Sequence, residues 1–146
     1  MPTRTARTAW TGTLEKGSGQ VELSSSHVGT YDVNFPKRAA DDAGGTTSPE
    51  EMIAAAHSSC YAMQLSALIA EAGGTPISLE VKADVSLGPD SAGGFRLTGI
   101  ALTVRGEVEG LDADGFAKAA EDAKATCPVS KALTGVDITL DAALKS

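Results

Sequence analysis

The sequence has few cysteines, no basic segment and a deficit of positive charge. Its 146 residues include two cysteines, and the formal net charge is −7 at pH 7. Two cysteines are too few for a disulfide scaffold or a cysteine-rich zinc site. Because the Lys and Arg residues are scattered in an acidic chain, we expect neither nucleic acid nor an anionic membrane as a partner.

Several common functional motifs are also missing. His27, His57, Cys60 and Cys127 do not have zinc-finger spacing, so we expect no metal site. The chain has no Gly-rich phosphate-binding loop and no nucleophile elbow around a serine. Nucleotide-binding and serine-hydrolase functions are therefore not indicated.

Signals for export and membrane insertion are absent as well. The start, Met1-Pro2-Thr3-Arg4, lacks the apolar core of a signal peptide, and no apolar run reaches membrane-spanning length without an interruption. We expect a cytoplasmic protein. In a reducing compartment, two cysteines are thiols with a chemical role or inert core residues, rather than a permanent disulfide. The length is typical of one domain, so we expect a single domain over residues 1–146.

The main feature that is present is a long apolar helix, predicted from Ser48 to about Ala72. Ser48 is a good N-cap, Pro49 suits the first helical position, and Glu51 completes a capping box. Two apolar faces recur at helical spacing: Met52, Ala56, Cys60, Met63 and Ala67 on one, and Tyr61, Leu65, Leu68 and Ala72 on the other. A helix that is apolar nearly all round is buried.

The other elements predicted from the pattern are mostly strands. Strands are expected within Thr3–Thr13, around Val21–Leu23, over Tyr31–Phe35, over Leu79–Leu87, from Phe95 to Val104 with a bulge near Thr98-Gly99, and around Val136–Leu140. An irregular polar loop is expected over Lys37–Thr47, a helix around Phe116–Ala123 and a short helix over Val129–Leu133.

This order lacks the regular alternation of a parallel β-α-β fold. It predicts an α+β domain in which a mainly antiparallel sheet packs on the buried central helix. A two-layer domain has difficulty covering both faces of such a helix. We therefore expect a second subunit to supply the missing cover, in a homodimer.

Either cysteine could carry the chemistry. Cys60 lies in the apolar helix, where burial alone would raise its pKa and make it inert, so a nucleophilic Cys60 needs a nearby cation. Arg38 is the best candidate because its charge is permanent. Cys127 precedes Pro128 and falls at the start of a short helix, which stabilises a thiolate. The residues alone do not decide which thiol attacks, and both could be core residues.

Two further polar residues lie on the central helix. His57 precedes Cys60 by one helical turn and could act as a base, although a structural role is more usual for a lone histidine. Glu50 suits the positive end of the helix dipole. Because it lies ten residues before Cys60, about 15 Å along a straight helix, it can reach a thiol only across a subunit interface or through a break in the helix.

The motifs together resemble one family. Pro49-Glu50-Glu51 leads to Ala55-Ala56-His57-Ser58-Ser59-Cys60, and Ala125-Thr126-Cys127-Pro128-Val129-Ser130 and Ile138-Thr139-Leu140-Asp141 follow. This combination, which spans most of the chain, is similar to the OsmC family (osmotically inducible protein C) and its relatives, the organic hydroperoxide resistance proteins (Ohr). Arg38, shortly before the helix, favours the OsmC branch.

The resemblance implies a cysteine-based thiol peroxidase, built as an intertwined homodimer with its sheet wrapped around the central helix. It implies reduction of organic hydroperoxides, and more weakly of hydrogen peroxide, in defence against oxidative and osmotic stress. Cys60 would be the peroxidatic cysteine and Cys127 the resolving one, with Arg38 and Glu50 as polar partners. For Arg38 the match is the least specific, and Lys37, or Arg4 and Arg7, are alternatives.

The implied cycle needs no cofactor. Cys60 would become a sulfenic acid and then a disulfide with Cys127, which an external dithiol, such as a lipoyl group, would reduce. An apolar pocket near Met52, Met63 and Phe116 would suit organic hydroperoxides. Two other hypotheses remain: a dimeric stress-related binding protein whose cysteines are structural, and thiol–disulfide exchange led by Cys127.

Overall fold

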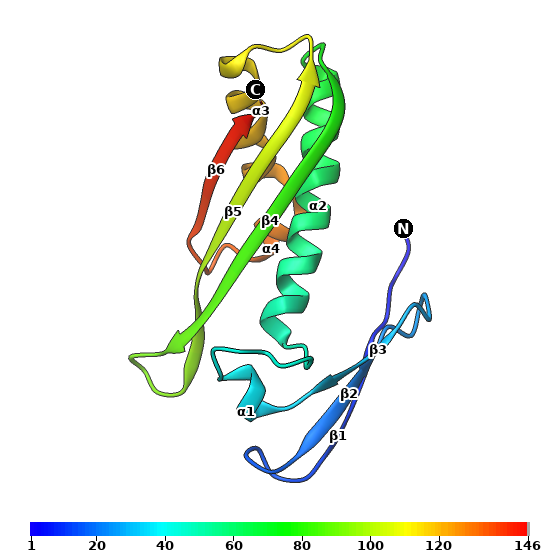
Figure 1. The fold of residues 1–146 in the computed structure, drawn as a ribbon, viewed down its shortest axis with the longest axis vertical. Coiled ribbons are helices and arrows are strands. Elements are labelled where there is room, and N and C mark those ends of the chain that lie inside the picture. Colours follow the sequence, from blue (N-terminus) through cyan, green and yellow to red (C-terminus); the bar gives the residue numbers. More distant parts are fainter. Residues whose placement is uncertain (146) are drawn as a thin grey trace. The chain divides into compact units, whose positions relative to one another are not determined.

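The computed structural model describes residues 1–145, and the chain divides into two compact units (Figure 1). The first unit covers Met1–Met52, and the second begins at Ile53. Helix α2, Pro49–Glu71, starts in the first unit and supplies the first element of the second. The expectation of one domain over residues 1–146 stays a prediction.

A small antiparallel sheet forms most of the first unit. Its strands are β1 (Arg7–Thr11), β2 (Ser18–Glu22) and β3 (Thr30–Val33), in the order β1-β2-β3. The first three predicted strands are thereby confirmed, and β1 and β2 pair antiparallel. Val21 is the buried hydrophobic side chain of this sheet, with 5% of its surface exposed.

The segment after β3 differs from the prediction. A strand was expected to continue to Phe35 and a loop to begin at Lys37, but Phe35–Arg38 forms the helical turn α1. The Asn34 side chain accepts a hydrogen bond from the Lys37 N–H at 2.9 Å, and Pro36 stands in the first turn. An asparagine cap followed by proline starts a helix, and this local geometry overrides the alternating apolar pattern.

Helix α2 confirms the predicted central helix to within a residue at each end. Ser48 Oγ accepts a hydrogen bond from the Glu51 N–H at 3.1 Å, as an N-cap does. The second half of the predicted capping box is replaced by another contact, because the Glu51 carboxylate accepts from the Thr47 hydroxyl at 2.6 Å. The helix start is therefore tied to the residue that precedes its cap.

A larger sheet organises the second unit. Strand β4 (Thr75–Pro89) pairs antiparallel with β5 (Phe95–Glu109), and β6 (Ile138–Leu144) pairs with the other edge of β5. Ser86 pairs with Gly99 and Leu87 with Leu97, so Thr98 is the extra residue of a bulge, as the shift in apolar phase predicted.

Strand β6 is parallel to β5, which the sequence pattern did not reveal. The mainly antiparallel character is confirmed, but it is distributed over two sheets, with one parallel pair. The parallel pair follows from the connection, because the chain between β5 and β6 passes through helices α3 (Ala113–Thr126) and α4 (Pro128–Ala132).

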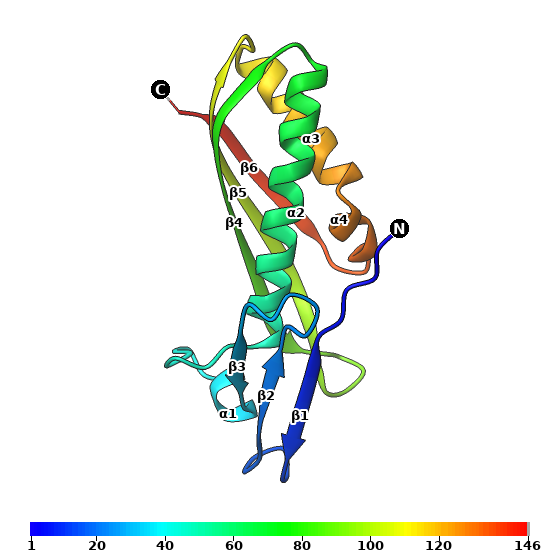
Figure 2. The same cartoon turned by 90° about the vertical axis from the view of Figure 1, so that its right-hand side faces the viewer.

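Helices α2 and α3 lie on one face of the larger sheet (Figure 2). The fully or nearly fully buried core between them consists of Tyr61, Leu65, Ile69, Ile100, Leu102, Val104, Phe116, Ala119, Ala120, Ala123 and Cys127. The predicted buried stripe of α3 is thus confirmed, and Cys127 continues it. No helix within residues 1–145 is long and apolar enough to cross a membrane.

Helix α2 is not buried all round within this chain. The stripe His57, Tyr61, Leu65 and Ile69 is fully buried. On another face, Ala56, Ser59, Met63, Ala67 and Ala70 are exposed, and Met63 exposes 74% of its surface. The first of the two predicted apolar faces is therefore largely a surface of the single chain.

Candidate active site

The second unit brings the two predicted thiols together. Cys60 lies in the middle of α2, and Cys127 ends α3 and stands at the N-cap of α4. Both are free thiols, and they lie close enough for hydrogen bonding between their side chains to shift the pKa of each. Cys127 is fully buried, whereas Cys60 is partly exposed. This arrangement places one accessible thiol beside one protected thiol.

The two thiols differ in acidity. Burial raises the pKa of Cys60, and the neighbouring Cys127 adds to this effect, although a hydrogen bond from the Val129 backbone opposes it. Burial also acts to raise the pKa of Cys127, but hydrogen bonds from the Ser130 backbone, the Cys60 thiol, the Ser130 hydroxyl and the Val129 backbone together lower it. Within one chain, Cys127 is therefore the more acidic thiol, because the start of α4 surrounds its sulfur with donors.

A histidine and a serine lie beside this thiol pair. The distance from His57 Nε2 to Ser130 Oγ is 2.7 Å, and both side chains are buried. Nδ1 of the same ring is buried and has no hydrogen-bond partner among the residues that the structure describes. Burial lowers the pKa of His57, so the ring is neutral near pH 7.

Ser130 was not singled out from the sequence. Its signal is its position three residues after Cys127, one helical turn along, which places both on the same side of α4. His57 has the same spacing from Cys60 on α2. A histidine–serine contact and a cysteine–cysteine contact thus connect the two helices.

The predicted polar pair forms within the first unit. Arg38 Nε donates to Glu50 Oε1 at 2.9 Å, and Arg38 Nη2 donates to Oε2 at 2.9 Å, which is the two-pronged geometry of a strong charge-assisted contact. The side chains expose 33% and 10% of their surfaces, respectively. Glu50 is therefore more than a residue that suits the helix dipole.

The alternatives to Arg38 have other contacts. Arg7 pairs with Glu22 at 3.6 Å, and the Arg4 guanidinium donates to the Thr3 carbonyl at 3.3 Å. Lys37 supplies its backbone N–H to the Asn34 cap. Arg38 is thus the basic residue that Glu50 orients, while its role toward a thiol remains a prediction.

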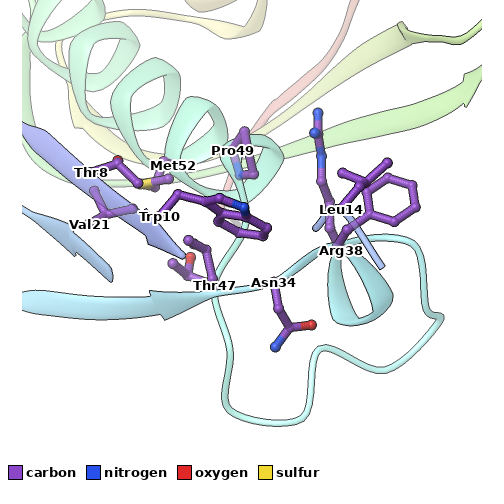
Figure 3. Close-up of a pocket in the computed structure, with 11 residues that line it drawn as sticks. Thr8, Trp10, Leu14, Val21, Asn34, Arg38, Thr47, Pro49 and Met52 are labelled. Atoms are coloured by element: carbon purple, nitrogen blue, oxygen red, sulfur yellow. The ribbon is translucent and has the colours of Figure 1, made fainter. Parts of the chain in front are cut away.

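An apolar cavity of about 290 Å³ lies next to this pair within the first unit. Trp10, Leu14, Val21 and Met52 contribute apolar surface to it (Figure 3). Figure 3 also shows Arg38 extending away from Asn34. Of the three residues expected around a pocket, Met52 does line this cavity. Phe116 belongs to the core of the second unit and Met63 is exposed, and for these two the expectation stays a prediction.

The four predicted site residues therefore form two pairs, Cys60 with Cys127 and Arg38 with Glu50. Helix α2 is continuous from Pro49 to Glu71, so the break that one expectation required is not present in it. No group of three or more His, Cys, Asp or Glu side chains in residues 1–145 is arranged to hold a metal ion.

Two free, neighbouring thiols on an α+β fold define a two-cysteine thiol protein. A family model described as OsmC-like protein matches residues 41–141, and this chain belongs to that family. The family resemblance of the motifs is thus confirmed.

Relatives and solved structures agree with this assignment. The chain is 43% identical over 137 residues to "Peroxiredoxin OsmC" of Escherichia coli K12, covering 94% of this chain and 93% of that protein. It is 36% identical over 124 residues to "Organic hydroperoxide resistance protein OhrA" of Bacillus subtilis, covering 83% and 85%. The crystal structure of OhrB of Bacillus subtilis superposes with a TM-score of 0.74 at 31% identity, covering 97% of this chain and 98% of that one.

Proposed function

We propose that the protein is a thiol-dependent peroxidase that reduces organic hydroperoxides to alcohols, and hydrogen peroxide more weakly, in defence against oxidative and osmotic stress. The observation that carries this proposal is the neighbouring pair of free thiols, a partly exposed Cys60 and a buried Cys127. The names of the relatives, a peroxiredoxin and an organic hydroperoxide resistance protein, support it.

Accessibility supports different roles for the two thiols. A peroxide can approach Cys60 more easily than Cys127, which has no exposed surface. Cys60 is therefore the peroxidatic cysteine and Cys127 the resolving one. Because burial raises the pKa of Cys60, its thiolate needs a positive charge that its own surroundings in the second unit do not provide. Arg38, held by Glu50, is the group we assign to this task.

The reaction follows from these roles. The Cys60 thiolate attacks the distal oxygen of the hydroperoxide, the O–O bond breaks, and the Arg38 guanidinium stabilises the alkoxide that leaves. The products are the alcohol and a Cys60 sulfenic acid. The Cys127 sulfur then attacks Cys60, the S–O bond breaks, and a disulfide and water form. An external dithiol, for which a lipoyl group is one candidate, reduces the disulfide.

We further propose that the protein is a homodimer in which Arg38 and Glu50 act on the thiols of the partner subunit. The exposed face of α2, formed by Ala56, Ser59, Met63, Ala67 and Ala70, supports a second copy as the occupant. Small residues allow another backbone to approach closely, and an apolar helix face of this length is unfavourable in water. Free thiols also fit a reducing compartment, and we place the protein in the cytoplasm.

The test is a stoichiometric reaction with cumene hydroperoxide, followed by the mass of the intact protein. The parent should lose two hydrogens, Cys127→Ser should gain one or more oxygens, and Cys60→Ser should not change. An unreacted parent protein would remove the peroxidase proposal and leave the cysteines as structural residues of a binding protein.

A second candidate function is thiol–disulfide exchange led by Cys127, which its lowered pKa favours. In that case reactivity would be lost in Cys127→Ser and retained in Cys60→Ser. Exposure of the protein to an oxidised dithiol, with the same two variants, distinguishes this exchange from peroxide reduction.

A further inference from the structure

One buried polar pair has no role in the chemistry described so far. His57 and Ser130 meet at 2.7 Å in the interior of the second unit, beside the two thiols. A histidine that serves only to fill a core would be expected to have both ring nitrogens hydrogen-bonded or to be replaced by an apolar residue. Here Nδ1 is buried without a partner in the described chain, which is unfavourable for a polar group.

The position of Ser130 indicates a function for this buried pair. Its hydroxyl lies 2.7 Å from His57 Nε2, and Ser130 follows Cys127 by one turn at the start of α4. Hydrogen bonding from the same hydroxyl is one of the causes that lower the pKa of Cys127. A hydroxyl is both a donor and an acceptor, so it can accept from one neighbour while it donates to the other. The Ser130 hydroxyl can therefore link the Cys127 sulfur to the imidazole ring.

We propose that Ser130 and His57 form a relay that takes the proton of Cys127 when this thiol attacks the Cys60 sulfenic acid. The proposal rests on the function proposed above. Ser130 touches the reacting sulfur and is a catalytic residue in this step. His57 acts through Ser130 and is a positioning residue that also receives the proton.

The step balances in atoms and charge. The Cys127 S–H proton passes to Ser130 Oγ, and the Ser130 hydroxyl proton passes to His57 Nε2. The Cys127 sulfur bonds to the Cys60 sulfur, and the S–O bond of the sulfenic acid breaks. The hydroxide that leaves takes the hydroxyl proton of Ser130 and becomes water, and His57 Nε2 returns its proton to Ser130 Oγ, so that both side chains are restored. Cys127 is oxidised, the sulfenic sulfur of Cys60 is reduced, and the products are the disulfide and one water.

The surroundings of the relay suit a transient transfer. The neutral His57 ring can accept a proton, and its burial ensures that the proton is not retained. The titratable neighbours of Cys127 are Cys60 and Tyr61 of α2, and Glu121 of α3 acts on Tyr61. Burial raises the pKa of Tyr61, whose hydroxyl donates to the Ala120 carbonyl at 2.8 Å, so Tyr61 does not compete as a base.

The first measurement is independent of peroxide chemistry. In Cys60→Ser the single remaining thiol is Cys127, so the ultraviolet absorbance of the thiolate reports its pKa directly. Adding Ser130→Ala should raise the pKa of Cys127, because a charge-assisted hydrogen bond to the thiolate is lost. At a pH below this pKa, the fraction of Cys127 present as thiolate should fall by about tenfold. An unchanged titration curve in Cys60→Ser with Ser130→Ala would overturn the proposal.

The second measurement is the rate at which the +16 mass species of the parent converts to the disulfide after one equivalent of cumene hydroperoxide. We expect Ser130→Ala and His57→Gln each to slow this step by about tenfold or more. Glutamine keeps a hydrogen-bonding nitrogen near the place of Nε2 but cannot take a proton, so a purely structural His57 predicts no loss in His57→Gln. Ser130→Ala should also move the pH profile of the step to higher pH, which a loss of stability alone would not do.

Ser58→Ala is the matched control, because it removes a serine hydroxyl from α2 next to His57, where it donates to the Ala55 carbonyl at 3.2 Å and not to His57 or a thiol. Conversion rates of His57→Gln and Ser130→Ala equal to that of Ser58→Ala would overturn the relay. If the parent never forms the sulfenic acid, the peroxidase proposal fails, and the titration of Cys127 still decides whether Ser130 acts on its sulfur.

Discussion

The two units of the molecule hold different parts of the candidate site. In the first unit, Arg38 and Glu50 form a charged pair next to an apolar cavity, and this unit has no cysteine. In the second unit, two thiols are held by backbone groups and a serine hydroxyl, inside a continuous apolar core. The thiols and the charged pair are thus built on different parts of the chain, and in the proposed homodimer the activity would depend on which copy of the first unit serves which thiol.

The largest effect is expected from mixing two inactive variants. Arg38→Ala lacks the charge and Cys60→Ser lacks the nucleophile. If Arg38 acts across a dimer, a mixed dimer contains one site with Cys60 from the first variant and Arg38 from the second. Equal mixing after subunit exchange should restore about a quarter of the parental sites, as symmetry requires. Peroxide consumption against time measures the recovery.

The two unmixed variants and a mixture of Arg38→Ala with Glu50→Gln serve as controls. In the mixture of Arg38→Ala with Glu50→Gln no intact site can form if one subunit supplies both Arg38 and Glu50, because each subunit then lacks one of the two residues. Recovery that fails in the first mixture, although subunit exchange is shown by mass, would mean that Arg38 serves the thiol of its own chain. The charged pair and the thiols would then act together within one subunit and not across an interface.

The second prediction compares how the two units are stabilised. Phe116 is 1% exposed and packs against β5, where a Cβ on Gly106 would lie 2.9 Å from its ring. Phe116→Ala should lower the free energy of unfolding by about 3–5 kcal/mol, because it leaves a cavity in the core. Val21→Ala should cost less, since complete burial of a valine is worth roughly 1.5–3 kcal/mol. Chemical denaturation measures both.

Equal losses in Phe116→Ala and Val21→Ala would show that the small sheet contributes as much to stability as the larger core. That outcome would contradict the expectation that the second unit contributes most of the free energy of unfolding, while the first unit holds the charged pair.

The fold was predictable where the signal is local. The alternation in β4, the shift of apolar phase at Thr98 and the stripe of α3 all reflect contacts between neighbouring residues of one element. The parallel pairing of β6 was not predictable in this way, because it depends on where α3 and α4 return the chain. The turn at Phe35–Arg38 was missed because a single side-chain cap outweighs a two-residue alternation.

The same division applies to the candidate site. Cys60, Cys127, Arg38 and Glu50 stand out by residue type, and the structure joins them in two pairs. Ser130 is an ordinary residue type, and its importance comes from a contact with His57 that is 73 positions away in sequence. Long-range contacts of this kind leave no pattern in one sequence. The position of the Ser130 hydroxyl next to His57 could therefore be found only in the structure.

The third prediction concerns the carboxylate that orients Arg38. Glu50→Gln keeps the shape of the side chain but removes the charge that holds the guanidinium by two contacts. We expect the rate constant for peroxide attack to fall by about tenfold, because a charge-assisted contact becomes a neutral one. Stopped-flow measurement of the first half-reaction reads the effect.

Glu51→Gln is the control for this charge change at the helix start. Its carboxylate accepts from the Thr47 hydroxyl rather than from Arg38, and the side chain is exposed. Both substitutions remove one negative charge from the first turn of α2 and weaken the same dipole contact. A rate loss of equal size in Glu50→Gln and Glu51→Gln would assign the effect to the dipole and not to Arg38.

The smallest effect is expected from Ser48→Ala, which removes the N-cap of α2. The Glu51 N–H would lose its partner at 3.1 Å, and the protein should be destabilised by about 1 kcal/mol. The rate of peroxide attack should stay at the parental value, because Ser48 contacts neither Arg38 nor a thiol in the described residues. A melting curve and the stopped-flow rate measure the two quantities. A slower reaction in Ser48→Ala would mean that the geometry of the helix start limits catalysis, and the rate loss in Glu50→Gln would then need no specific contact with Arg38.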